Sequence, residues 1–254
     1  VVYTTDNNVS NVISTKIGSI KKNTTDVFFT MVDLFQLINA NKNKNGYDNL
    51  FLDLSELYEI EVENGKKLKD LVRSDLYNAN LTFDNKVYSI PWGTSIEGLV
   101  YNKDVLDKYG IEQLPRTTDE LQETFDLLKS GVTANGELVS QKDQVKGAIS
   151  TANNAGYLEF LWASWWAQYE GLENYSRYFS CLPDGASFDA IPDFNYLKQN
   201  GKLIALEELE RFSSKSSGYM HPESNNLNNY QVQIKFLDGE IAFLPCGDWL
   251  EVES

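Results

Sequence analysis

Strand-like apolar runs alternate with helical segments along most of the chain. The runs VKGAIS and EIAFLPCG are short and apolar, which is typical of buried strands. The stretch TTDELQETFDLLKS begins with the capping-box pair Thr117 and Glu120. It then places Leu121, Phe125 and Leu128 on one face, so it predicts a helix. This alternation favours an α/β fold in which helices cover a mainly parallel sheet, with ligands bound beyond the carboxyl ends of the strands.

The acidic composition argues against several classes of partner. The 254 residues include 22 Lys and Arg and 37 Asp and Glu, a formal net charge of −15. Such a surface repels nucleic acid and anionic membranes, so we expect neither as a main partner. The single histidine, His221, leaves zinc hydrolases and histidine-based triads without their usual residues, and no metal site is expected. Cys181 and Cys246 lie in no metal-binding spacing, and we expect both to be unpaired.

The same sequence pattern occurs at three predicted strand ends: FFT before MVD, SIP before WGT, and FLP before CGDW. In each case an apolar run stops and a carboxylate or an indole follows. Ligand sites are commonly built on such strand-end loops. For Trp92, which lies between Pro91 and Gly93, packing inside its own lobe is the alternative interpretation. For Asp33, the alternative is a helix N-cap. The candidate positions are Asp33, Trp92, Asp248 and Trp249.

Three longer stretches occur in a characteristic joint order: TDVFFTMVDLFQLI, then KVYSIPWGTSIEGLVYNKDVLDKYGI with LPRTTDELQETFDLLK, then FLDGEIAFLPCGDWLEVE. They contain Tyr-Asn-Lys-Asp before a helix, Pro-x-Thr-x-Asp-Glu-Leu, and Phe-x-x-Gly-x-x-Ala-x-x-x-x-Gly-x-Trp. In this order the chain resembles the carbohydrate-type extracellular solute-binding proteins of ABC importers (family 1) over nearly its whole length. Against that family it looks like a fragment missing both ends.

The resemblance implies a periplasmic-binding-protein-like (type II) fold, in which two α/β lobes are joined by a strand hinge. Residues 1–100 would form an incomplete first lobe and residues 101–254 the second, with GLVYN as the first crossing. It also implies a monomer that captures a sugar or oligosaccharide between the lobes and delivers it to ABC permease subunits, without catalytic residues or cofactors. The location would be extracellular, as a Gram-positive cell-surface lipoprotein or in a periplasm. Membrane contact would come only through a lipid anchor that this chain does not contain.

The site residues follow from the resemblance and from sugar chemistry. A sugar ring has an apolar C–H face, which an aromatic wall can cover, and a rim of hydroxyls, which carboxylates can bind. Trp249 ranks first because it matches the family's Trp after Gly-x. Of the indoles in WASWW, which share one helical stripe approximately, most are expected in the core and one at the rim of the site. The expected ligand-binding residues are Trp249, Trp92, Asp33, Asp248, Trp162 (or Trp165 or Trp166) and Tyr157.

Rival functions remain open at this point. A glycoside hydrolase needs two carboxylates across a sugar site, and Asp33, Glu97, Asp248 and Glu251 could supply them. A binding protein for a peptide or a polyamine is a second rival, because the net charge suits a cation. A structural or interaction domain is a third.

Overall fold

The computed structural model describes residues 27–29, 51–79, 86–153, 156–183, 186 and 190–253. The chain divides into two compact units, Val1–Thr94 and Ser95–Ser254, and each is described by itself. Asp33 and the helix predicted after it lie outside the described residues. Residues 27–29 of the strand predicted before Asp33 are described, and they form no strand. No helix within the described ranges has the length and apolar character that a membrane span requires.

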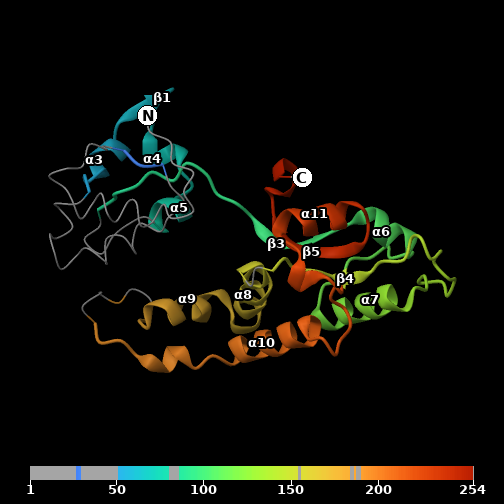
Figure 1. Ribbon diagram of the computed structural model, residues 1–254. Coiled ribbons are helices and arrows are strands. Elements are labelled where there is room, and N and C mark those ends of the chain that lie inside the picture. The colour runs from blue at the N-terminus through green and yellow to red at the C-terminus, as the bar shows by residue number, and fades with distance from the viewer. Residues whose placement is uncertain are drawn as a thin grey trace. The chain divides into compact units, whose positions relative to one another are not determined.

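The described part of the first unit consists of short helices and strands (Figure 1). Tyr58 is fully buried, its hydroxyl donates to the Ser89 carbonyl at 2.9 Å, and its ring packs edge-on against Tyr77. In the VYSI run, which the sequence pattern predicts as a strand, only Val87 makes a bridge. The elements are α3 Ser55–Tyr58, β1 Glu61–Glu63, β2 Lys66–Lys67, α4 Leu68–Leu71 and α5 Ser74–Ala79.

The second unit is built on a sheet in the order β3-β5-β4. Its strands are β3 (Glu97–Tyr101), β4 (Gly147–Ile149) and β5 (Ile241–Gly247). β4 runs parallel to β5, whereas β3 runs antiparallel to it. The prediction of a mainly parallel sheet is therefore wrong for the described strands, because the chain enters β3 at the edge where β5 ends. The GLVYN segment lies largely in β3, which pairs with β5 along its whole length.

Helices cover both faces of this sheet. Figure 1 shows α11 on one face of β5, and α7 with α8 on the other. The helix α10 lies along α8. The helices of the second unit are α6 Lys103–Lys108, α7 Thr118–Ser130, α8 Gly156–Glu170, α9 Leu172–Ser180, α10 Asn200–Ser213, α11 Asn229–Leu237 and α12 Leu250–Glu253, with 3-10 turns η3 Phe194–Leu197 and η4 Ser224–Asn226.

The predicted helix at TTDELQETFDLLKS is confirmed as α7, with one difference at its start. The Thr117 hydroxyl accepts from the Glu120 N–H at 3.1 Å, as a capping box requires. The Glu120 carboxylate, however, accepts from the Arg116 N–H at 2.6 Å. The apolar face that the sequence predicts is buried in the core. The helix ends at Gly131, whose φ of +68° favours glycine.

Two apolar clusters hold the second unit together, and β5 contributes residues to both of them. In the first, the Phe125 ring lies 5.4 Å from the rings of Phe212, Tyr219 and Phe243. The second contains Ala152, Leu227, Val232, Phe236, Ile241, Leu244 and Cys246. β5 is buried along its whole length because it contributes to both clusters. Both cysteines are free, as predicted: Cys246 is buried in the second cluster and Cys181 is half-buried.

His221 is buried beside the amino ends of β4 and β5. Its backbone N–H donates to the Ile149 carbonyl, and its Nδ1 accepts from the Glu223 N–H at 3.2 Å. Its Nε2 lies 3.5 Å from the Glu240 carboxylate. Burial lowers the pKa of His221, and the nearby Lys235 lowers it further, while Glu240 and Glu223 oppose the shift. The neutral imidazole is therefore the form that fits this site.

This arrangement predicts a loss of stability in mild acid. The pKa of His221 is lower in the folded state than the usual ~6.5 of the unfolded chain, so the unfolded state binds the proton more readily. The free energy of unfolding should fall as pH drops below ~6.5, by at most about 1.4 kcal/mol per pH unit. Urea unfolding at pH 7.5, 6.5, 5.5 and 5.0 measures this.

The matched control is His221→Gln, which keeps a polar side chain and cannot titrate. A hydrogen bond with Lys146 holds the pKa of Glu240 at about 2, so the stability that Glu240 contributes is lost only as the pH falls below about 4.5, under the range of this titration. An unchanged pH slope in His221→Gln would contradict the assignment.

Candidate functional site

The carboxyl ends of β4 and β5 meet at one edge of the second unit's sheet, here called the carboxyl edge. β3 begins at the same edge, because Glu97 pairs with Gly247 in the antiparallel register. The Asp248 N–H donates to the Ile96 carbonyl at 3.0 Å, which fixes the turn that follows β5. The edge thus collects residues from the start of β3 and from the segments after β4 and β5, as expected for ligand sites of α/β folds.

Trp249 folds back over the end of β5, and the absence of a side chain at Gly247 makes this conformation possible. A Cβ built on Gly247 would lie 2.1 Å from the indole Cζ3 and 2.5 Å from Cε3. Because the indole is large and the strand is buried, neither could move aside at low cost. The Gly-x-Trp spacing noted in the sequence therefore has a steric cause.

Trp249 lies within an aromatic group at the carboxyl edge. Its ring centroid is 5.8 Å from that of Phe160 and 6.5 Å from that of Tyr157, and both contacts are edge-on. The indole is half-buried and also packs against the second apolar cluster. Burial raises the pKa of Tyr157, and a hydrogen bond with Trp249 opposes the shift. Tyr157 therefore remains a neutral hydroxyl at neutral pH.

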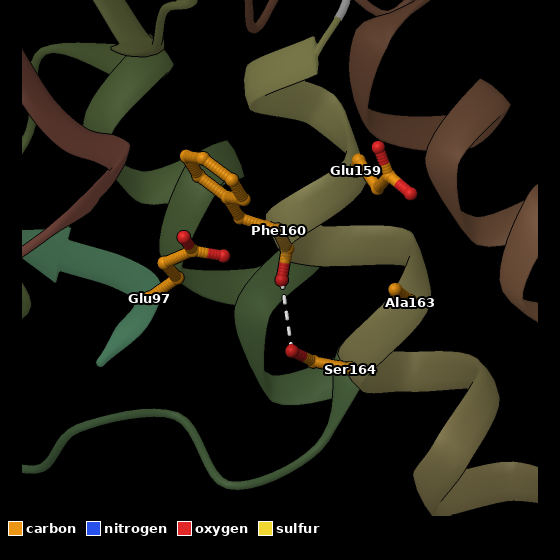
Figure 2. Close-up of a pocket in the computed structure, with 5 residues that line it drawn as sticks. All are labelled: Glu97, Glu159, Phe160, Ala163 and Ser164. Carbon is orange, nitrogen blue, oxygen red and sulfur yellow. Dashed lines mark hydrogen bonds between the residues drawn. The ribbon is translucent and has the colours of Figure 1, made fainter. Parts of the chain in front are cut away.

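Beside these aromatic residues, a pocket of about 380 Å³ lies between β3 and the first half of α8. This volume falls within the range of small-molecule sites. Figure 2 shows the Glu97 side chain extending from β3 toward α8, on the side of the helix that carries Phe160. The Ser164 hydroxyl donates to the Phe160 carbonyl at 2.8 Å. The lining residues are Glu97, Glu159, Phe160, Ala163 and Ser164.

A second, more open depression of about 570 Å³ surrounds the N-terminus of α11. Most of its lining is amide: two of these residues, Asn228 and Gln231, form the capping box of the helix. The Asn153 N–H, after β4, donates to the Leu227 carbonyl at 2.7 Å. The lining residues are Asn153, Asn226, Leu227, Asn228, Asn229, Tyr230 and Gln231.

The indoles of WASWW lie away from the aromatic group of Trp249. Trp166 is only 2% exposed and stacks on Trp162 at 5.5 Å, and Trp165 packs on Phe212. Trp162 follows Phe160 by two positions, which corresponds to about 200° around a helix. Trp162 is thus on the far side of α8 from the pocket. Phe160 and Ser164, which the sequence reasoning missed, continue the i, i+3, i+7 face that starts at Tyr157.

The other predicted residues occupy different settings. Asp248 is exposed at the turn after β5. Trp92 belongs to the first unit and is 70% exposed, so it is not packed into that unit's core. Glu97, considered in sequence only as a carboxylate of a rival hydrolase, lines the pocket. In the described part of the chain, no three His, Cys, Asp or Glu side chains gather in a group that could hold a metal.

Solved structures share this fold. A solute-binding lipoprotein of Streptomyces coelicolor superimposes with a TM-score of 0.62 at 14% identity, covering 96% of this chain and 52% of its own. RafE of Streptococcus pneumoniae superimposes with a TM-score of 0.60 at 17% identity, covering 98% of this chain and 54% of its own. A third structure is a binding protein of an ABC transporter from Bifidobacterium animalis subsp. lactis in complex with mannobiose. It superimposes with a TM-score of 0.56 at 18% identity, covering 98% of this chain and 50% of its own. The chain thus spans about half the length of these proteins.

These structures confirm the predicted periplasmic-binding-protein-like α/β fold. A search of curated protein sequences finds no match. The family model described as bacterial extracellular solute-binding protein matches residues 1–177. Because this match covers more than half of the chain, the chain belongs to the bacterial extracellular solute-binding proteins.

Proposed function

We propose that this chain is part of a protein that captures a sugar or oligosaccharide outside the cell and delivers it to the permease subunits of an ABC importer. The observation that carries the proposal is the aromatic group of Trp249, Tyr157 and Phe160, which lies beside Glu97 and Asp248 at the carboxyl edge. Membership of the solute-binding family supports a binding role, without catalysis.

The chemistry of this edge suits a carbohydrate. The faces of sugar rings carry C–H groups that pack on aromatic rings, and the ring hydroxyls need hydrogen-bond partners. Carboxylates and amides supply such partners: Glu97 in the first pocket, and the asparagines around α11 in the second. Some structural neighbours bind such ligands: one from Bacillus licheniformis is a complex with stachyose, and the Bifidobacterium protein binds mannobiose.

The two compact units would correspond to the two lobes of such a protein, with the first lobe incomplete. The unit boundary between Thr94 and Ser95 lies slightly before the lobe boundary at 100/101 expected from sequence. In this assignment the first lobe contributes Trp92 and Asp33, and the second contributes Trp249, Tyr157 and Asp248. Trp162 is left out because it lies across α8 from the pocket. A lipid anchor on a Gram-positive cell surface, or a periplasm, would keep the protein at the importer.

The first test is a thermal-shift screen against mono- and oligosaccharides, with peptides and polyamines as alternative ligands. A ligand that binds only the native state, present at 100 times its Kd, should raise the free energy of unfolding by about 2.7 kcal/mol. For a protein of this size, that corresponds to a Tm increase of roughly 5–10 °C. A shift with a peptide or polyamine and with no sugar would refute the proposal. Cleavage of an oligosaccharide during incubation would favour the hydrolase.

A second prediction concerns the wall that Trp249 forms. Trp249→Ala should weaken binding of the sugar found in the screen by about 2 kcal/mol, or roughly 30-fold in Kd, because the sugar ring loses the apolar surface on which it packs. The matched control is Phe194→Ala, which removes an exposed aromatic ring from η3. Calorimetry measures both variants. Equal losses in the two variants, or none in Trp249→Ala, would remove Trp249 from the site.

A third prediction tests how the indole is positioned. Gly247→Ala should lower sugar affinity nearly as much as Trp249→Ala does, because the added methyl group occupies space that the indole needs. The control is Gly98→Ala on the paired strand β3, where an added Cβ has no neighbour within 4 Å. Near-UV circular dichroism should change in Gly247→Ala and not in Gly98→Ala. Full sugar affinity in a folded Gly247→Ala protein would show that the observed indole position is not needed for binding.

A further inference from the structure

The segments that meet at the carboxyl edge contain no cationic side chain. Residues 95–102, 147–170 and 240–253 include no Lys, Arg or His. Glu240, the first residue of the last segment, lies at the opposite edge of the sheet, where it pairs with Lys146 and Lys235. The carboxyl edge itself carries the acidic residues Glu97, Glu159, Asp248, Glu251 and Glu253, the last of which accepts a hydrogen bond from the Gln233 amide.

Glu97 is the member of this group that is best placed to meet a ligand. It is exposed, it lines the pocket with Phe160, and its register with Gly247 holds it beside the strand end that leads to Trp249. Among the described residues it makes no side-chain hydrogen bond or ion pair. Burial is the main cause of the raised pKa of Tyr157, and the charge of Glu97 adds to it.

We propose that Glu97 determines the charge specificity of this site: it accepts hydrogen bonds from the hydroxyls of neutral sugars and excludes acidic sugars such as uronates. The inference rests on the proposed function and specifies its substrate class. An ionised carboxylate only accepts hydrogen bonds, so it suits hydroxyl groups and the ammonium of an amino sugar. A uronate carboxylate would face Glu97 and its acidic neighbours with no cation from the carboxyl edge to offset the repulsion.

The repulsion has a limited range and magnitude. At physiological ionic strength, charges in water are screened beyond about 8 Å, so Glu97 acts on a ligand in its own pocket. For single exposed pairs the effect is on the order of two- to fivefold in Kd. A site that also loses water when the ligand enters should discriminate more strongly, because the effective dielectric constant falls.

The test compares matched pairs of neutral and acidic oligosaccharides by titration calorimetry. The pairs are oligomers of galactose and of galacturonate, oligomers of mannose and of mannuronate, and xylo-oligosaccharides without and with a glucuronate branch. The wild-type chain should bind the neutral member of a pair more tightly. Glu97→Gln keeps an acceptor oxygen and removes the charge. It should therefore reduce the ratio of the Kd of the acidic sugar to the Kd of the neutral sugar by about two- to fivefold. In the wild-type chain, 0.5 M salt should also reduce this ratio, because salt screens the repulsion.

Glu137→Gln is the matched control. It removes the same charge from an exposed position in the turn between Val132 and Leu138, in the connection that enters β4 from the opposite edge, and it should leave the ratio unchanged. The inference would be overturned if the wild-type chain bound acidic sugars as tightly as neutral ones or more tightly, or if Glu97→Gln and Glu137→Gln changed the Kd ratio equally. Neither result would contradict the proposed sugar binding. Binding of no sugar at all would overturn the proposed function and the inference together.

Discussion

The pairing of β5 with both of its neighbours is the interaction on which the second unit depends. β5 is buried along its whole length, with β3 antiparallel on one side and β4 parallel on the other. Each register brings polar side chains to the carboxyl edge. The antiparallel register puts Glu97 opposite Gly247, and the parallel register brings the segment after β4, which contains Asn153, to the same edge. A shift by one residue would turn every side chain of a strand to the other face of the sheet. The site therefore depends on the same hydrogen bonds as the fold.

Much of this arrangement could be predicted from the amino-acid pattern. VKGAIS and EIAFLPCG contain strands β4 and β5, and α7 is capped by Thr117 and has the expected buried face. The direction of β3 could not be predicted in this way, because alternation of polar and apolar residues is the same for parallel and antiparallel strands. The VYSI run shows a further limit of such patterns. Its residues have strand propensity, but Val87 and Tyr88 are buried with only one bridge, at Val87, and the Ser89 carbonyl accepts from the Tyr58 hydroxyl instead of from a neighbouring strand.

The candidate site shows a similar division. Trp249 and Tyr157 could be identified from a motif and from aromatic character, and the structure brings them together. Trp162 could not be assigned, because α8 carries apolar residues on all sides and helical periodicity then identifies no single buried face. The tertiary packing decides which side is covered: α9 packs on Trp166, α10 packs on Trp165, and β3 approaches the side of Phe160. The sequence offers Glu97 only as a candidate carboxylate of a rival hydrolase, since its place in the pocket follows from the register of β3 with β5.

The charged groups of the second unit are separated along its strands. At the amino ends of β4 and β5, Lys146 and Lys235 both reach Glu240, and His221 is buried beside them. The three segments that form the carboxyl edge carry no Lys, Arg or His there, and Glu97 and Asp248 are exposed in the part of the chain that the structure describes. Acidic groups that are neutralised at one end contribute to stability, whereas those left unpaired at the other end set an electrostatic potential for a ligand. Because the two ends share β5, the strand that fixes the fold also separates the part of the unit predicted to respond to mild acid from the part proposed to bind a sugar.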